Sequence, residues 1–132
     1  VINENGEYVS PNEIIAILLK YLKNKGLDGA VVKTVGSSLL IDNVAKFLNV
    51  DLIETAVGFK HVGEAMRLNK VVIGGEESGG LSILGHIPEK DGLIANLLIT
   101  AVPIGGGTIS EMFIISMMGF PVAALPILTI IA

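Results

Sequence analysis

The clearest indication of the architecture is the sequence Val71-Val72-Ile73-Gly74-Gly75-Glu76-Glu77-Ser78-Gly79-Gly80, in which an apolar run passes directly into a glycine-rich loop. A short β-branched run before glycines is typical of a buried strand that ends in a loop. The loop offers two carboxylates and a hydroxyl, which can hydrogen-bond to the neighbouring hydroxyls of a polyol. The same residue types also form ordinary surface turns, so both a binding site and a turn are open at this point.

Helix and strand signals alternate around this loop. The sequence Ser10-Pro11-Asn12-Glu13 has the pattern of a capping box with proline at the first helical position, and Gly26 is placed to end that helix. Ser37 or Ser38 is placed to cap a second helix, and Asp91 a fourth. The second helix is expected to bury an apolar face formed by Leu40, Val44, Phe47 and Leu48. The other helices are expected at about residues 11–25, 60–69 and 92–101, and strands at 30–35, 52–56 and 70–73.

The alternation of these elements predicts the fold class. Strands that are separated by helices of about ten or more residues are joined by crossover connections, which favour parallel pairing. We therefore predict a three-layer α/β/α fold with a mixed, mainly parallel sheet of about four strands, three of which can be placed by residue number. Ligands of such sheets bind at the carboxyl ends of the strands, where the loop at residues 75–80 lies.

Composition sets further limits. A chain of 132 residues fits one domain, and an apolar content of 51% excludes a disordered class. Nine basic residues against thirteen acidic ones, without a Lys/Arg cluster, argue against a nucleic-acid partner. The absence of cysteine excludes disulfides and thiolate metal sites. Because the first residues also lack the pattern of a secretory signal, we expect a cytoplasmic location.

Other candidate sites are weaker. His61 and His86 are the only histidines, and no carboxylates accompany them at ligand spacing, so we expect no metal site in this chain. His61 is expected on an exposed helix face, whereas His86 either orders its loop or donates to a phosphosugar. Gly36-Ser37-Ser38 is either a helix cap or an anion site. The run Gly105-Gly106-Gly107-Thr108 lacks the lysine of a nucleotide-binding loop.

Three ordered motifs carry a resemblance to a known family. Thr55-Ala56-Val57-Gly58-Phe59-Lys60, Gly75-Glu76-Glu77-Ser78-Gly79 and Glu89-Lys90-Asp91-Gly92 resemble, in order and spacing, the third domain of the alpha-D-phosphohexomutases, the phosphoglucomutase and phosphomannomutase family. The resemblance covers about residues 1–101, and residues 1–6 look like the sequence that follows the aspartate-rich metal loop of the family. Residues 102–132 form a hydrophobic C-terminal segment that does not match.

The resemblance implies that the glycine-rich loop binds the sugar. Glu76 and Ser78, with Gly75 before them, fall on the sugar-binding loop of the family, where the acid and the hydroxyl are expected to bind ring hydroxyls in either orientation of the substrate. Glu77 falls on the variable middle position and is a weaker candidate. As a loop carboxylate, Glu76 is expected to be exposed and to contribute little to stability.

Two further motifs complete the implied cleft. Gly58, Phe59 and Lys60 match the loop that lines the cleft beside the sugar loop. Lys90 matches a lysine that lies near the transferred phosphoryl group in many relatives, which makes it the catalytic candidate of this chain. His86 matches a less constant position and is a weaker substrate-binding candidate.

The resemblance also implies what the chain does not contain. The family moves a phosphoryl group between O1 and O6 of a hexose phosphate, with a phosphoserine, a Mg²⁺ loop and a phosphate-binding loop that lie in its other domains. We therefore expect a sugar-recognition domain that is inactive alone, with glucose or mannose phosphate and the other domains as partners. No cofactor is expected in this chain, and Mg²⁺ is expected in the full-length enzyme. Both epimers remain open, as does a free-standing α/β binding or interaction module without catalysis.

The C-terminal segment has a composition of its own. From Met112 to Ala132 there is no charged residue, and 16 of 21 residues are apolar, which is close to the length of a membrane span. Pro121 and Pro126, together with the lack of flanking basic residues, argue against a span. A buried element and a non-native terminus remain the alternatives.

Overall fold

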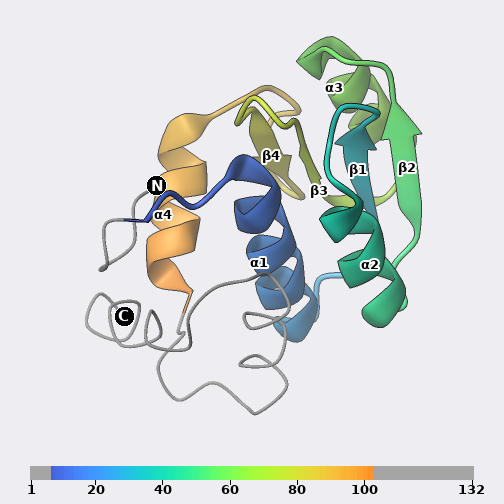
Figure 1. Ribbon diagram of the computed structural model, residues 1–132. Helices are drawn as coiled ribbons and strands as arrows, with labels where there is room; N and C mark the ends of the chain where they lie inside the picture. Colours follow the sequence, from blue (N-terminus) through green and yellow to red (C-terminus); the bar gives the residue numbers. More distant parts are fainter. Residues whose placement is uncertain (1–6, 103–132) are drawn as a thin grey trace.

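The computed structural model describes residues 7–102, which form four helices and four strands (Figure 1). The expectations for residues 1–6 and 103–132 lie outside the described residues. The elements, in chain order, are α1 (Pro11–Asn24), β1 (Ala30–Thr34), α2 (Leu39–Phe47), β2 (Leu52–Thr55), α3 (Phe59–Leu68), β3 (Val71–Gly75), β4 (Leu81–Ile83) and α4 (Gly92–Ala101).

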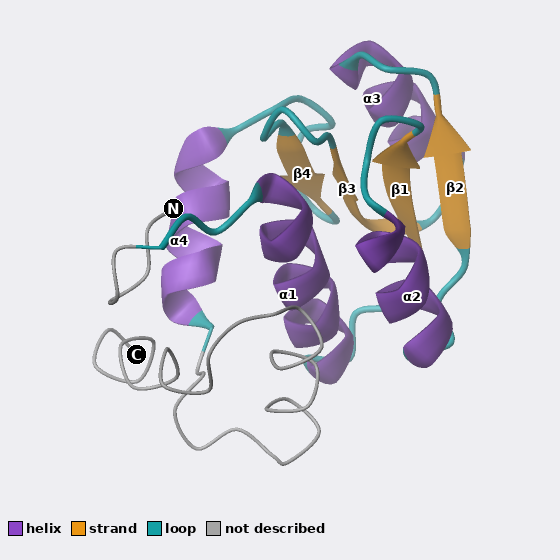
Figure 2. Cartoon of the chain, viewed as in Figure 1, coloured by secondary structure: helices purple, strands orange, loops and turns teal. Residues whose placement is uncertain are grey.

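The four strands form one sheet in the order β2-β1-β3-β4. β1 is central and pairs in parallel with both β2 and β3, whereas β4 runs antiparallel to β3 as the second strand of a hairpin. α1, α2 and α4 share one hydrophobic core against one face of the sheet, and α3 packs on the other face (Figure 2). The predicted three-layer α/β/α fold with a mixed, mainly parallel sheet is confirmed.

Alternating residues of β1 connect the two cores. Val31 points into the larger core, which contains the buried stripe of α1, and Val32 points into the smaller core with Phe59 and Val62 of α3. All four of these side chains are buried. Because successive side chains of a strand point to opposite faces, a strand that is apolar on both faces must be covered on both.

The local signals of the helix ends are confirmed. The Ser10 side chain and Glu13 form the capping box of α1, and Gly26 follows this helix with a φ of +84°. The cap of α2 is Ser38, whose Oγ accepts the Leu40 N–H at 3.1 Å, and Asp91 caps α4. Each of these contacts joins groups only a few residues apart, so the sequence alone predicts them.

Three expectations about the elements were wrong. Gly75 is the last residue of β3 rather than the first of the loop, α3 begins at Phe59 rather than Lys60, and Phe47 is 54% exposed rather than buried. Six residues at about 100° each place Phe47 about 120° around α2 from the buried Ile41, and hence outside the packed face. β4 was included in the expected strand number but had no predicted position.

Candidate functional site

The hairpin between β3 and β4 makes a tight turn over residues 76–80, hereafter the β3–β4 turn. The Glu76 N–H donates to the Gly80 carbonyl at 2.8 Å, and the Gly79 N–H donates to the Glu76 carbonyl at 3.1 Å. Gly79 has a φ of +101°, which favours glycine. The turn lies at the carboxyl end of β3, the edge of the sheet at which ligands of α/β folds bind.

Glu76 is buried and joins the three motifs that carry the family resemblance. One oxygen, Oε1, accepts the Gly58 N–H at 3.1 Å. The other oxygen, Oε2, lies 3.4 Å from the Ser78 hydroxyl and 3.7 Å from the Lys90 ammonium. Its exposed fraction is 3%, so the expectation of an exposed carboxylate was wrong. The reason is that α3 and the segment before α4 cover the turn with polar partners for both oxygens.

The close approach of these groups explains Gly80. A Cβ atom at Gly80 would lie 2.7 Å from Glu76 Oε2 and 2.9 Å from Cδ2 of Phe59. Phe59 is buried at the start of α3, and the Lys90 ammonium lies 6.0 Å from the centre of its ring. Lys90 itself has a side-chain exposure of 61%, so its ammonium reaches solvent while it pairs with Glu76. Glu76, its polar partners Gly58, Ser78 and Lys90, and the Phe59 ring form a compact group, hereafter the Glu76 cluster. The Lys90 ammonium is its solvent-exposed cation.

The neighbouring carboxylate, Glu77, has different partners. Its Oε2 accepts a hydrogen bond from the Thr34 hydroxyl at 2.5 Å, and Thr34 Oγ1 lies 3.1 Å from Ser37 Oγ. The hydrogen bond from Thr34 holds the pKa of Glu77 below its usual value. Both residues are buried; Ser37 belongs to the segment Gly36-Ser37-Ser38 that the sequence offered as a helix cap or an anion site, whereas Thr34 was not predicted at the site. Thr34 is the last residue of β1 and so lies at the same sheet edge as the turn, but its local sequence does not show that its hydroxyl faces Glu77.

Lys60 and the histidines lie outside the Glu76 cluster. Lys60 is exposed in the first turn of α3 and forms no ion pair within residues 7–102. His61 is half-buried rather than exposed. His86 Nε2 lies 3.1 Å from Asp91 Oδ2, a contact that ties the loop before α4 to its cap. The structure thus brings Gly58, Phe59, Ser78 and Lys90 to Glu76, and places His86 against Asp91 instead.

Asp91 leads to a prediction about acid stability. Hydrogen bonds from the backbone N–H groups of Ile94 and Leu93 hold the pKa of Asp91 below its ordinary value. A carboxyl whose pKa is lower in the folded than in the unfolded state stabilises the fold above its unfolded pKa, and the stabilisation is lost as the pH falls through the folded value. We expect the unfolding free energy, measured with urea from neutral pH to about pH 2.5, to fall less steeply below about pH 4 in Asp91→Asn. Asparagine also caps helices, so equal acid slopes would contradict the role of the Asp91 charge.

The groups of the predicted anion site are engaged in the fold. The Ser37 N–H donates to the Thr34 carbonyl at 3.0 Å, and the Ser38 N–H donates to the Asn12 side chain at 3.0 Å. Ser38 Oγ is the cap of α2. These contacts favour the structural role of Gly36-Ser37-Ser38 over anion binding.

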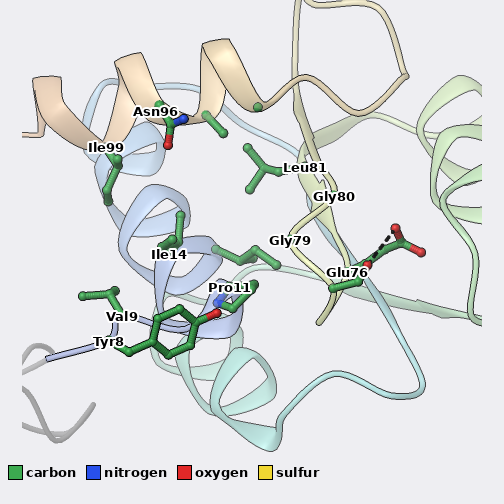
Figure 3. A pocket seen from close by; sticks show the side chains of 14 residues that line it. Tyr8, Val9, Pro11, Ile14, Glu76, Gly79, Gly80, Leu81, Asn96 and Ile99 are labelled. Carbon is green, nitrogen blue, oxygen red and sulfur yellow. Dashed lines mark hydrogen bonds between the residues drawn. The ribbon is translucent and has the colours of Figure 1, made fainter. Parts of the chain in front are cut away.

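A cavity of about 300 Å³ lies beside the β3–β4 turn, between the start of α1 and α4 (Figure 3). Its walls include Pro11, Ile14 and Leu81, which are apolar. Glu76 borders this cavity, but its carboxylate points away from Pro11 and Ile14. Glu76 and Ser78 of the Glu76 cluster also line this cavity, so the cluster and the apolar walls adjoin, and sugar hydroxyls fit the cluster better than the apolar walls.

Residues 7–102 contain neither a group of metal-ligating side chains nor a helix that could span a membrane. Within residues 7–102, no three His, Asp or Glu side chains are grouped so that they could hold a metal ion. The Mg²⁺ expected for the full-length enzyme therefore has no cage in this part of the chain and stays a prediction. Over the same residues, none of the helices has the length and apolarity needed to cross a bilayer.

Comparison with known proteins relates the sequence and the fold to a family. Residues 10–115 match the family model described as phosphoglucomutase/phosphomannomutase, alpha/beta/alpha domain III. The chain is 36% identical over 108 residues to the phosphoglucosamine mutase of Carboxydothermus hydrogenoformans, covering 80% of this chain and 24% of that protein. The identity to the phosphoglucosamine mutase of Listeria monocytogenes is 37% over 114 residues, covering 84% of this chain and 25% of that protein.

Solved structures show the same relationship. The putative phosphomannomutase of Thermus thermophilus superimposes with a TM-score of 0.72 and 27% identity, over 98% of this chain and 27% of that one. The phosphoglucomutase-type protein pp63/parafusin from Paramecium gives a TM-score of 0.59 and 30% identity, over 69% of this chain and 16% of that one.

The chain belongs to the phosphoglucomutase/phosphomannomutase family. Within this family it corresponds to domain III, the alpha/beta/alpha domain, and it spans about a quarter of the length of the curated relatives it matches. The family match extends to residue 115, beyond the boundary that we placed after residue 101. Val102, at the start of the C-terminal segment, is buried in the larger core. The division at residue 101 stays a prediction.

Proposed function

We propose that this domain recognises the sugar of a hexose phosphate in a phosphohexomutase. The observation that carries the proposal is the position of Glu76, a buried carboxylate at the carboxyl end of β3 that contacts Gly58, Ser78 and Lys90. A buried carboxylate with charged and polar partners accepts strong, directed hydrogen bonds. It is therefore suited to bind two adjacent hydroxyls of a sugar ring together with the Ser78 hydroxyl.

The exposed Lys90 supplies the charge that a phosphorylated substrate needs. Its ammonium pairs with Glu76 at 3.7 Å and is free to turn toward a phosphoryl group, since most of the side chain is in solvent. Gly58 donates its N–H to Glu76 and fixes the orientation of the carboxylate. In this proposal Glu76 and Ser78 bind the ring, Lys90 lies near the transferred phosphoryl group, and Gly75, Phe59 and Lys60 shape the surrounding cleft.

The reaction that we propose for the parent enzyme is phosphoryl transfer between O1 and O6 of the hexose. Such transfer depends on positioning and on neutralising charge, which requires a phosphate carrier and a cation besides the sugar site. We infer that these parts, including Mg²⁺, come from other domains. Because the relatives quoted above are phosphoglucosamine mutases, glucosamine phosphate joins glucose and mannose phosphate as a substrate to test.

The proposal predicts that the 132-residue chain binds without catalysis. We expect no conversion of glucose 1-phosphate, mannose 1-phosphate or glucosamine 1-phosphate, with or without Mg²⁺, in a coupled assay. We expect these ligands to shift the amide resonances of Glu76 and Ser78 in NMR titrations, because bound hydroxyls change the hydrogen bonds of the turn. Mutase activity above a protein-free blank would contradict the inference that the catalytic parts come from other domains. Shifts confined to residues away from the β3–β4 turn would favour an interaction module.

A further inference from the structure

Glu76 and Glu77 are adjacent, but their carboxylates are held by different parts of the fold. Glu76 accepts the N–H of Gly58, the residue that precedes α3 on one face of the sheet. Glu77 accepts the hydroxyl of Thr34, which ends β1 and leads into α2 on the other face. Two consecutive residues of the β3–β4 turn thus hydrogen-bond to segments on opposite faces of the sheet.

The partner of Glu77 is prearranged. Thr34 has an exposed fraction of 0%, and its hydroxyl is also 3.1 Å from that of Ser37. Gly36 leaves room for the carboxylate, because a Cβ atom there would lie 3.1 Å from both Cδ and Oε1 of Glu77. Thr34, Ser37 and Gly36 therefore form a preorganised binding position for the Glu77 carboxylate.

The hydrogen bonds of Glu76 and of Glu77 are expected to respond differently to a bound ligand. Under the proposed function, Glu76 exchanges some of its partners for sugar hydroxyls when the substrate binds. An anchor that is lost on binding cannot hold the turn in place during binding. Glu77 has its contact on the side of β1 and α2, so it can keep the turn fixed while Glu76 changes partners.

We propose that Glu77 is a positioning residue for the sugar-binding turn: its hydrogen bond with Thr34 fixes the turn so that Glu76 and Ser78 face the substrate. The proposal rests on the proposed function of Glu76 and Ser78. It gives Glu77 a role that needs no contact with the sugar. It also explains why a threonine at the end of β1 is buried with its hydroxyl directed at the turn.

The test uses amide hydrogen exchange and NMR titration on the 132-residue chain. In Glu77→Ala the Glu76 and Gly79 amides, which close the turn, exchange about tenfold faster, as expected for the loss of one hydrogen bond to a charged group. The dissociation constant for glucose 1-phosphate rises by about the same factor. Glu77→Gln keeps an acceptor oxygen and stays within about threefold of the unmodified chain in both measurements. Amides of β1 and β2 are unchanged in all variants.

Matched variants separate anchoring from folding and from direct binding. Thr34→Val removes the donor together with its contact to Ser37, and reproduces at least the effect of Glu77→Ala. Adding Glu77→Ala to Thr34→Val changes nothing further, because the interaction between the two side chains is already lost. Thr34→Ser keeps the hydroxyl and leaves the exchange rates near those of the unmodified chain. Glu64→Ala, on an exposed position of α3, changes neither measurement.

Three results would overturn the proposal. The first is unchanged exchange of the turn in Glu77→Ala. The second is additive effects of Thr34→Val and Glu77→Ala. The third is weak sugar binding in Glu77→Gln with normal exchange of the turn, which would make Glu77 a direct ligand. If the unmodified chain binds no sugar phosphate, the proposed function fails and the role in sugar positioning fails with it, while the exchange rates alone still decide whether Glu77 anchors the turn.

Discussion

Changing Glu76 to alanine in a complete phosphohexomutase that carries this domain is expected to lower kcat/KM by more than about tenfold. The variant loses a charged acceptor for a substrate hydroxyl, an effect of about 1.5–3 kcal/mol. It also leaves the Gly58 N–H and the Lys90 ammonium without their partner, so the loop before α3 loses a contact that orients it. The measurement is steady-state kinetics with glucose, mannose and glucosamine phosphates as substrates.

Because Glu76 is buried, the Glu76→Ala experiment needs a control that separates lost binding from lost stability. Because the carboxylate is 3% exposed and hydrogen-bonded, its removal also lowers stability, contrary to the expectation for an exposed loop. Glu76→Gln keeps the shape and one acceptor oxygen, so it separates the loss of charge from the loss of packing. Glu64→Ala, exposed on α3, tests whether any lost carboxylate has the same effect. Full activity of Glu76→Ala at a temperature where it remains folded would return the β3–β4 turn to a purely structural role.

The second large effect concerns stability. Lys33, the fourth residue of β1, is 2% exposed and pairs with Asp42 of α2 and with Glu54 of β2, the latter at 3.3 Å. Burial lowers the pKa of Lys33, but the hydrogen bonds with the two carboxylates outweigh it, and the pKa lies above its ordinary value. We expect Lys33→Ala to lower the free energy of unfolding by about 2–3 kcal/mol, through the lost packing of its buried stem and the lost pairing.

Two variants make the Lys33 prediction specific. Lys33→Met keeps most of the buried volume, and the carboxylates that lose their partner, Asp42 and Glu54, have side-chain exposures of 35% and 48% and can be solvated, so we expect a loss below about 1 kcal/mol. Lys46→Ala, exposed on α2, should change stability by less than about 0.5 kcal/mol. Urea unfolding of the 132-residue chain measures all three. A Lys33→Ala variant as stable as Lys46→Ala would show that the ion pairs and the buried stem contribute little.

Within the candidate site, the sequence indicated the members but not their contacts. The motifs containing Gly58, Ser78 and Lys90 were identified by type and order, and the structure brings all three to Glu76. Thr34 was not identified, because nothing in its local sequence distinguishes a strand-end threonine that faces a turn from one that faces solvent. Its contact with Glu77 crosses 43 positions of the chain and depends on how β1 and β3 pair.

By itself, the sequence determined the helix caps, the alternation of helices and strands, and hence the three-layer α/β/α class. Those features rest on hydrogen bonds and apolar periodicities that span a few residues, such as the contact of Ser10 with Glu13. Only the tertiary structure decided the position of β4, the exposure of Phe47 and the burial of Glu76. Gly58 lies 18 positions from Glu76 and meets it because the parallel strands β2 and β3 end at one edge of the sheet. Lys90 meets it because the segment after the antiparallel β4 returns to that edge, where the Asp91 N–H donates to the Leu81 carbonyl at 3.2 Å.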